Sequence, residues 1–159
     1  YKTLGSHIYD QVFLLYLFPD QQRQQIEETF WVYGLAPIYP RISEGSVDSL
    51  QPTLHWQSFP RTSDVMVAPE EMSRVKNVRY DLVIARGDML YAEVIYRREG
   101  LSDTKHAVET SLSPATNYLW SVRACFELDG RERVTEWGGN SRRNVNSTAP
   151  YSYPVKTPK

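Results

Sequence analysis

The sequence predicts a mainly β protein: an antiparallel Greek-key β-sandwich preceded by a partly helical N-terminal extension. Composition gives the first indication, because 11 Tyr, 4 Trp and 10 Pro among 159 residues favour strands and turns over helix bundles. The second is the segment 112–128, LSPATNYLWSVRACFEL, in which mostly apolar residues recur at every second position. The third is the turn sequence that begins this segment.

Alternation with a period of two over residues 118–128 indicates a strand with one buried face. The residues expected to point into the core are Tyr118, Trp120, Val122, Ala124, Phe126 and Leu128. The residues expected to point the other way are Leu119, Ser121, Arg123, Cys125 and Glu127. This is the strongest strand signal in the chain.

The turn before the strand contains Pro114, which fixes the bend, and ends at Tyr118. The tyrosine is placed for its hydroxyl to bond the backbone near that turn. Such a tyrosine corner is a feature of Greek-key sandwiches.

The pattern L-x-P-x-T-x-Y-x-W-x-V-x-A at 112–124 resembles the corner and following strand of fibronectin type III domains. The resemblance covers about residues 40–140. It implies further strands at 42–50, 52–56, 78–86, 89–98, 105–112 and 132–137. It also implies that Trp56 is a core tryptophan and that the inward residues of 78–86 are Val78, Tyr80, Leu82 and Ile84.

The chain therefore divides into three parts: an N-terminal extension (1–39) that packs on the sandwich, the fibronectin type III-like domain (40–140), and an extended basic tail rich in Pro, Ser and Tyr (141–159). The extension is predicted to hold a helix from about Pro19–Asp20 to Gly34. Before it, HIYDQVFLLYLF could be strand or helix.

The connection at residues 61–77 is longer than a sandwich of this kind needs. Pro69 suits the first turn of a helix, and the two acids that follow suit a helix N-terminus. We expect a short helix or turn at this point.

Charge and composition exclude several classes of partner. The formal net charge of −1 creates no global field for nucleic acid or membrane, and no apolar run approaches the ~20 residues that span a bilayer. The tail is basic through Arg142, Arg143, Lys156 and Lys159, as expected of a solvated linker. One cysteine cannot form an intrachain disulfide.

Catalytic machinery is not visible in the sequence. The histidines His7, His55 and His106 lack metal-ligand spacing, and no phosphate loop or nucleophile motif appears. Cys125 lies mid-strand on the outward face, not in an arrangement that would activate a nucleophile. We expect a non-enzyme without metal or cofactor.

The tripeptide Arg86-Gly87-Asp88 is an adhesion motif in integrin-binding fibronectin modules. Pairing Ile84 with Leu90, Leu82 with Ala92 and Tyr80 with Val94 aligns the inward faces of two strands and leaves the tripeptide as a three-residue hairpin tip. Glycine and aspartate also suit any tight turn. In the integrin-binding module, moreover, the motif lies on a different loop.

Trp137 and Arg123 resemble the tryptophan–arginine stack of cytokine-receptor modules. A three-residue turn after the strand at 118–128 places the two on the outer face and pairs Val134 with Phe126 in the core. A two-residue turn at Asp129-Gly130 instead points Trp137 inward. We favour the outer position, where a cation–π contact forms.

The resemblance implies a non-enzymatic, extracytoplasmic binding or scaffolding protein. The segment SVDSLQPTLHWQSFP is similar to bacterial surface and periplasmic lipoproteins, which implies a lipid anchor upstream of Tyr1 and an outer-membrane or periplasmic location. The expected partner is a protein or a cell-surface glycan. The residues expected to bind it are Arg97, Arg98, Arg123, Tyr91, Glu70 and Glu71.

Two alternatives remain open at the level of sequence. One is a secreted or cell-surface eukaryotic adhesion or receptor ectodomain, which would use Arg86-Gly87-Asp88 and the glycosylation sequence at 146–148. The other is an accessory domain of a carbohydrate-active or proteolytic enzyme.

Overall fold

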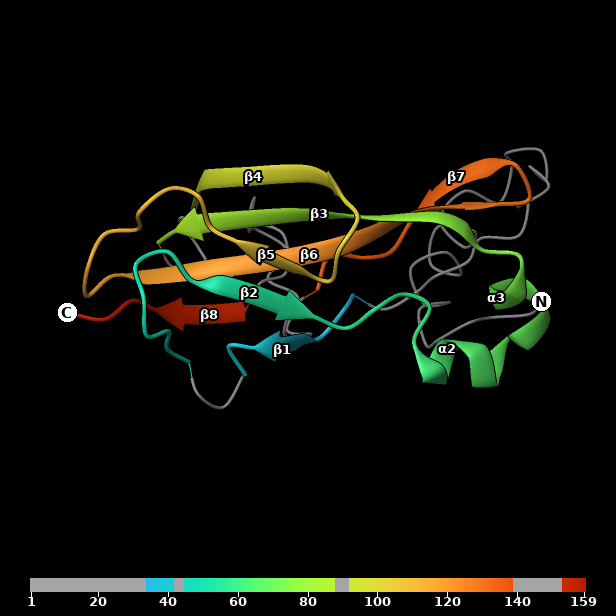
Figure 1. Ribbon diagram of the computed structural model, residues 1–159, viewed down its shortest axis with the longest axis horizontal. Coiled ribbons are helices and arrows are strands. Elements are labelled where there is room, and N and C mark those ends of the chain that lie inside the picture. The colour runs from blue at the N-terminus through green and yellow to red at the C-terminus, as the bar shows by residue number, and fades with distance from the viewer. Residues whose placement is uncertain (1–33, 42–44, 88–91, 139–152) are drawn as a thin grey trace, which may run out of the picture.

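The computed structural model describes residues 34–41, 45–87, 92–138 and 153–159 (Figure 1). The predicted helix that begins near Pro19 and the glycosylation sequence at 146–148 lie outside these ranges. The elements are β1 (Pro37–Tyr39), β2 (Thr53–Trp56), α2 (Thr62–Val67), α3 (Pro69–Ser73), β3 (Lys76–Arg86), β4 (Glu93–Leu101), β5 (Lys105–Ala107), β6 (Asn117–Leu128), β7 (Arg131–Val134) and β8 (Tyr153–Lys156).

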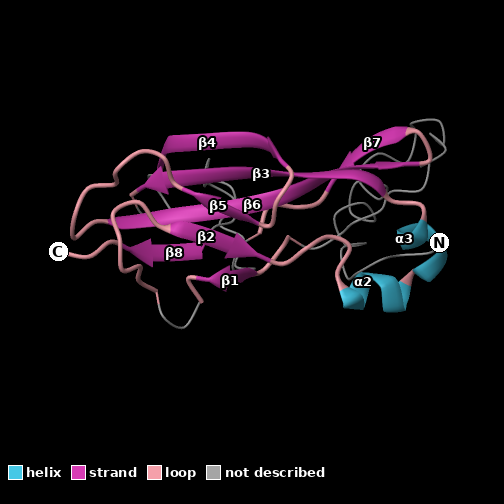
Figure 2. Cartoon of the chain, in the orientation of Figure 1, coloured by secondary structure: helices cyan, strands magenta, loops and turns pink. Residues whose placement is uncertain are grey.

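The described chain forms two antiparallel sheets. One has three strands in the order β1-β2-β5, and the other has five, in the order β4-β3-β6-β7, with β8 also paired to β6. Strands far outweigh the two short helices (Figure 2). The predicted mainly β, antiparallel class is therefore confirmed.

The two sheets share one apolar core. Trp56 of β2 meets Tyr80 of β3 edge to face, with ring centroids 5.7 Å apart, so the contact joins the two sheets. The predicted inward positions on the three core strands are buried except for Val78, which is partly buried against the core; the buried ones are Trp56, Tyr80, Leu82, Ile84, Tyr118, Trp120, Val122, Ala124, Phe126 and Leu128. Burying a large apolar side chain contributes about 1.5–3 kcal/mol, so this set dominates folding.

The tyrosine corner is present. The backbone N–H of Ser113 donates to the Tyr118 hydroxyl at 2.9 Å, and Tyr118 itself is buried. The hydroxyl of Thr157, next to β8, donates to the Ser113 carbonyl at 2.7 Å. The turn before β6 is thus held from both sides.

The expectation of an exposed outer face along β3 and β6 is wrong over part of their length. The outward-pointing Val83, Ala85, Leu119 and Ser121 are at most 6% exposed. An unbroken apolar run such as Leu82–Ala85 is typical of a strand buried on both faces. The alternation of apolar and polar residues in β6 identifies one buried face but does not show that part of the other face is buried too.

The predicted register between 78–86 and 89–98 is also wrong. Ile84 pairs with Tyr96, and Arg86 with Glu93, so the connection spans residues 87–92 and Arg86–Asp88 is not a three-residue tip. Asp88 and Tyr91 lie outside the described residues. Around Ile84 the slip is an even number of residues, which alternation cannot distinguish. A bulge between Ile84 and Ala85 then pairs Val94 with Ala85, so Val94, predicted to point inward, is 43% exposed.

Two strands of the described sheets lie outside the residues 40–140 that the resemblance covers. Residues 153–156, expected in a solvated tail, form β8 along the edge of β6 that β7 leaves free, pairing Tyr118 with Val155. Residues 37–39, assigned to the extension, form β1 beside β2. The predicted strand at 42–50 is reduced, in its described part, to a parallel bridge from Ser46 to Lys156. Alternating burial in β8 (Tyr153 and Val155 in, Pro154 and Lys156 out) was too short a pattern to stand out.

The long connection between β2 and β3 contains a helix where Pro69 predicted one, with the proline in the first turn. It also contains α2, which the sequence had not indicated. Figure 1 shows both helices at one end of the molecule, beyond β2 and close to the start of β3.

Replacing Tyr118 by Phe tests the corner. The substitution keeps the ring but leaves the Ser113 N–H without its acceptor, so we expect a loss of about 1–3 kcal/mol in the free energy of unfolding, measured with urea. A loss below about 0.5 kcal/mol would show that the hydrogen bond does not hold the turn.

Candidate functional site

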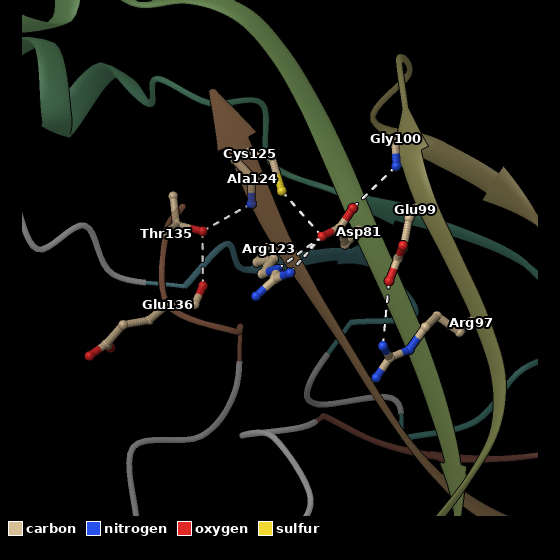
Figure 3. A network of polar contacts seen from close by, with 9 residues as sticks. All are labelled: Asp81, Arg97, Glu99, Gly100, Arg123, Ala124, Cys125, Thr135 and Glu136. Atoms are coloured by element: carbon tan, nitrogen blue, oxygen red, sulfur yellow. Dashed lines mark hydrogen bonds and ion pairs between the residues drawn. The ribbon is translucent and has the colours of Figure 1, made fainter. Parts of the chain in front are cut away.

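A polar cluster lies on the face of the five-stranded sheet that points away from the shared core (Figure 3). It consists of Asp81 from β3, Gly100 from β4, Arg123 and Cys125 from β6, and Trp137 after β7; we call it the Asp81 cluster. Asp81 stands directly opposite Arg123 in the β3–β6 pairing, which is why the two side chains meet.

Both oxygens of the Asp81 carboxylate accept hydrogen bonds. Oδ1 accepts a hydrogen bond from the N–H of Gly100 at 3.1 Å. Oδ2 accepts hydrogen bonds from Nε–H of Arg123 at 3.0 Å and from the thiol of Cys125 at 3.2 Å. Nη2 of Arg123 lies 2.9 Å from the same oxygen. The side chain of Asp81 is 9% exposed and that of Arg123 is 31% exposed, so the pair is largely desolvated.

These contacts set the charge state of Asp81. Burial acts to raise the pKa of the carboxyl, but the hydrogen bonds from Cys125, Arg123 and Gly100 together outweigh it, and the pKa lies below its ordinary value. Asp81 is therefore an ionised partner for Arg123. It is not poised to take a proton from a substrate near neutral pH.

The pKa of Cys125 is shifted upward, in contrast to that of Asp81. Burial, followed by the hydrogen bond to Asp81 and its negative charge, raises the pKa of the thiol to about 11. A nucleophilic cysteine requires a thiolate, which a lowered pKa supplies. The thiol of Cys125 acts as a hydrogen-bond donor to a carboxylate.

The turn between β6 and β7 corrects one prediction. Leu128 pairs with Arg131, and the residues between them, Asp129 and Gly130, have φ of 54° and 75°, so the turn has two residues and not the three we favoured. Val134 accordingly lies opposite Cys125 and is 51% exposed, outside the core.

Trp137 still meets Arg123, whose guanidinium carbon lies 4.6 Å from the ring centroid. The N–H of Thr135 donates to the carbonyl of Ala124, and that of Gly138 to Val122, so three steps along this segment oppose two along β6. The extra residue reverses the side-chain phase and turns Trp137 to the outer face. The predicted cation–π contact is confirmed, through a bulge that the sequence did not reveal.

The predicted binding residues do not form one surface. Arg97 lies beside the Asp81 cluster and pairs with Glu99 at 3.4 Å, both side chains being well exposed (Figure 3). Glu70 and Glu71 lie on α3. Arg86 pairs with Glu93 at 3.5 Å near the β3–β4 connection, and Gly87 is exposed beside it.

Arg98 belongs to a second cluster that links the two sheets. It pairs with Glu109, and its guanidinium carbon lies 4.9 Å from the ring centroid of Tyr96 on β4. The Tyr96 hydroxyl lies 2.6 Å from Nε2 of His106 on β5. Burial lowers the pKa of His106, the charge of Glu109 raises it and that of Arg98 lowers it further, so the imidazole favours its neutral form.

Sequence reasoning missed Asp81 and the β4–β5 contacts. A signal was available for Asp81, which is the one carboxylate in the run Tyr80–Ala85. A charge in such a buried strand needs a charged or hydrogen-bonding partner, because burying it unpaired is costly. No comparable signal marks Gly100, whose N–H reaches Asp81 from a different strand.

No protein-family model and no curated protein matches the sequence. Within the described ranges, no group of three or more His, Cys, Asp or Glu side chains is placed to hold a metal ion. Neither described helix has the length and hydropathy needed to cross a membrane. The contacts of the Asp81 cluster provide rigid, charge-balanced groups at a surface.

Replacing Asp81 by Asn should lower the free energy of unfolding by about 2–4 kcal/mol at pH 7, because Arg123 loses its charge partner in a desolvated position. The matched control is Glu99→Gln, which breaks the exposed pair with Arg97 and should cost less than about 1 kcal/mol. Equal effects would contradict the burial argument.

The same variant tests the pH dependence. Because the pKa of Asp81 is lower in the folded chain, its contribution to stability is present above the ordinary pKa of about 3.9 and is lost as the pH falls through the folded value. Urea unfolding in this acidic range should therefore show a smaller pH dependence for Asp81→Asn than for the wild type.

The thiol provides an independent measurement. With a pKa of about 11, Cys125 should react with an aromatic disulfide reagent at pH 8 at least about tenfold more slowly in the folded chain than in urea. Asp81→Asn should speed the folded-state reaction. Equal folded and unfolded rates would show that the thiol is neither shielded nor held by Asp81.

Proposed function

We propose that the chain is a non-enzymatic binding or scaffolding module on a fibronectin type III-like Greek-key sandwich, acting outside the cytoplasm. The observation that carries the fold part is the strand order. The three-stranded sheet contains the segments 52–56 and 105–112, which the resemblance assigned to the family's strands B and E, and the other sheet contains those assigned to C′, C, F and G. The described part of the segment assigned to strand A, 42–50, has no counterpart among the strands, and β1 at Pro37–Tyr39 takes the place beside β2. The tyrosine corner and buried Trp56 support the same proposal.

The binding part rests on what the outer face of the five-stranded sheet offers. Arg123 is held between Asp81 and the ring of Trp137, so its orientation is fixed, and the exposed Arg97 and Glu99 lie nearby. Rigid arginine and tryptophan side chains are favoured at protein interfaces because little entropy is lost on binding. The partner that suits this surface is a protein or a glycan that carries both positively and negatively charged groups.

The titratable side chains of the Asp81 cluster do not favour catalysis. Asp81 is ionised and hydrogen-bonded through both oxygens, and Cys125 is held as a thiol, so neither supplies a base or a nucleophile. The location outside the cytoplasm, as a bacterial envelope lipoprotein, rests on the sequence resemblance alone.

The test is a pull-down from the envelope fraction of the native organism, with the wild-type chain as bait. We expect a partner that is retained by the wild type, is depleted at least about tenfold by the double substitution Arg97→Glu and Trp137→Ala, and is unaffected by Lys105→Ala on the exposed part of β5. Circular dichroism establishes that each variant is folded.

Two results would contradict the proposal. One is a set of captured proteins no richer than that of an unrelated sandwich domain. The other is location of the native protein in the cytosol when cells are fractionated and probed with antibody.

A further inference from the structure

The short helix α2 (Thr62–Val67) presents apolar side chains to solvent. Val65 is 44% exposed, Met66 79% and Val67 65%, and none of the helix's residues is buried. These side chains add nothing to the core, so folding does not account for them. Exposed apolar side chains that lie close together mark a candidate interaction surface.

The helix is nevertheless held firmly at its ends. Arg61 donates from its backbone N–H to Asp64 Oδ2 at 2.8 Å, and the two side chains form an ion pair at 2.8 Å with 16% and 12% exposure. Arg61 also reaches the carbonyl of Gly34 at 3.3 Å. After the helix, Ala68 is buried. The backbone that carries the exposed residues is therefore held at both ends.

Two glutamates lie next to this helix in the sequence. The adjoining helix α3 begins with Pro69, followed by Glu70 and Glu71 in its first turn. Arg61 is held by Asp64, and Arg74, at the end of α3, is held by Asp129 at 2.9 Å. Glu70 is exposed, and no described residue forms an ion pair with it.

We propose that Val65, Met66 and Val67, with the acidic start of α3, form a docking surface for a basic amphipathic helix of a partner protein. The apolar face of that helix covers the three side chains, and its Lys or Arg residues meet the Glu70 side. Methionine suits such a surface because its flexible thioether adapts to the partner. An anionic lipid surface fits less well, because it repels the acidic rim.

The inference gives a partner chemistry to the proposed binding module and so rests on that function. It concerns a different surface from the Asp81 cluster: Figure 1 shows α2 and α3 at one end of the molecule, away from β4. The two surfaces can therefore be tested separately.

The probe is a synthetic amphipathic peptide of about 14 residues built from Leu and Lys, titrated against the full chain and followed by NMR shifts of the described backbone. We expect Met66→Asp to weaken binding at least about tenfold and Glu70→Lys to weaken it severalfold. The matched control, Val134→Asp, changes another exposed apolar residue and should leave affinity within about twofold. Met66 is largely exposed, so its substitution should leave the melting temperature unchanged.

Two further probes, an acidic peptide and lipid vesicles, distinguish a basic helix from other ligands. A Leu/Glu peptide of the same pattern should bind at least about tenfold more weakly, and phosphatidylglycerol vesicles should not bind. The proposal is overturned if Met66→Asp and Val134→Asp act alike, if the acidic peptide binds equally, or if vesicles bind while the peptide does not. A pull-down partner that survives Met66→Asp overturns this inference alone, whereas failure of the pull-down with peptide binding intact overturns only the envelope function.

Discussion

The antiparallel pairing of β3 with β6 is the constraint on which the rest of the structure depends. In this register Tyr80 and Leu82 stand opposite Ala124 and Val122, and all four enter the core that the two sheets share. Asp81 then stands opposite Arg123 on the other face. A slip of one residue would send the carboxylate into the apolar core, where burying an unpaired charge is prohibitive. Core and Asp81 cluster are thus two consequences of one register.

The parts of the fold that the sequence predicted are those governed by local pattern. Period-two alternation identified β6 and its inward face, and the corner at Tyr118 followed from a proline and a tyrosine four residues apart. The parts it did not predict depend on pairing between distant segments. The β3–β4 register allowed several even shifts, and β8 is short and separated from β6, its pairing partner, in the sequence.

The candidate site shows the same division. The contact between Arg123 and Trp137 was predicted from residue types, but the bulge that produces it depends on Thr135 and Gly138 bonding to β6. Asp81 was overlooked because alternation marked it as merely outward, although the two-sided burial of β3 makes its pairing obligatory. The exposed helix α2 could not be predicted from the sequence, because six residues are too few to show a helical period.

The most direct measurement is a set of nuclear Overhauser contacts between β3 and β6 in the labelled chain. The account predicts cross-strand backbone contacts between Asp81 and Arg123 and between Leu82 and Val122. It also predicts contacts from the Trp56 indole to the ring of Tyr80. Backbone contacts that pair Asp81 with Val122, or a Trp56 ring without contacts to β3, would contradict it.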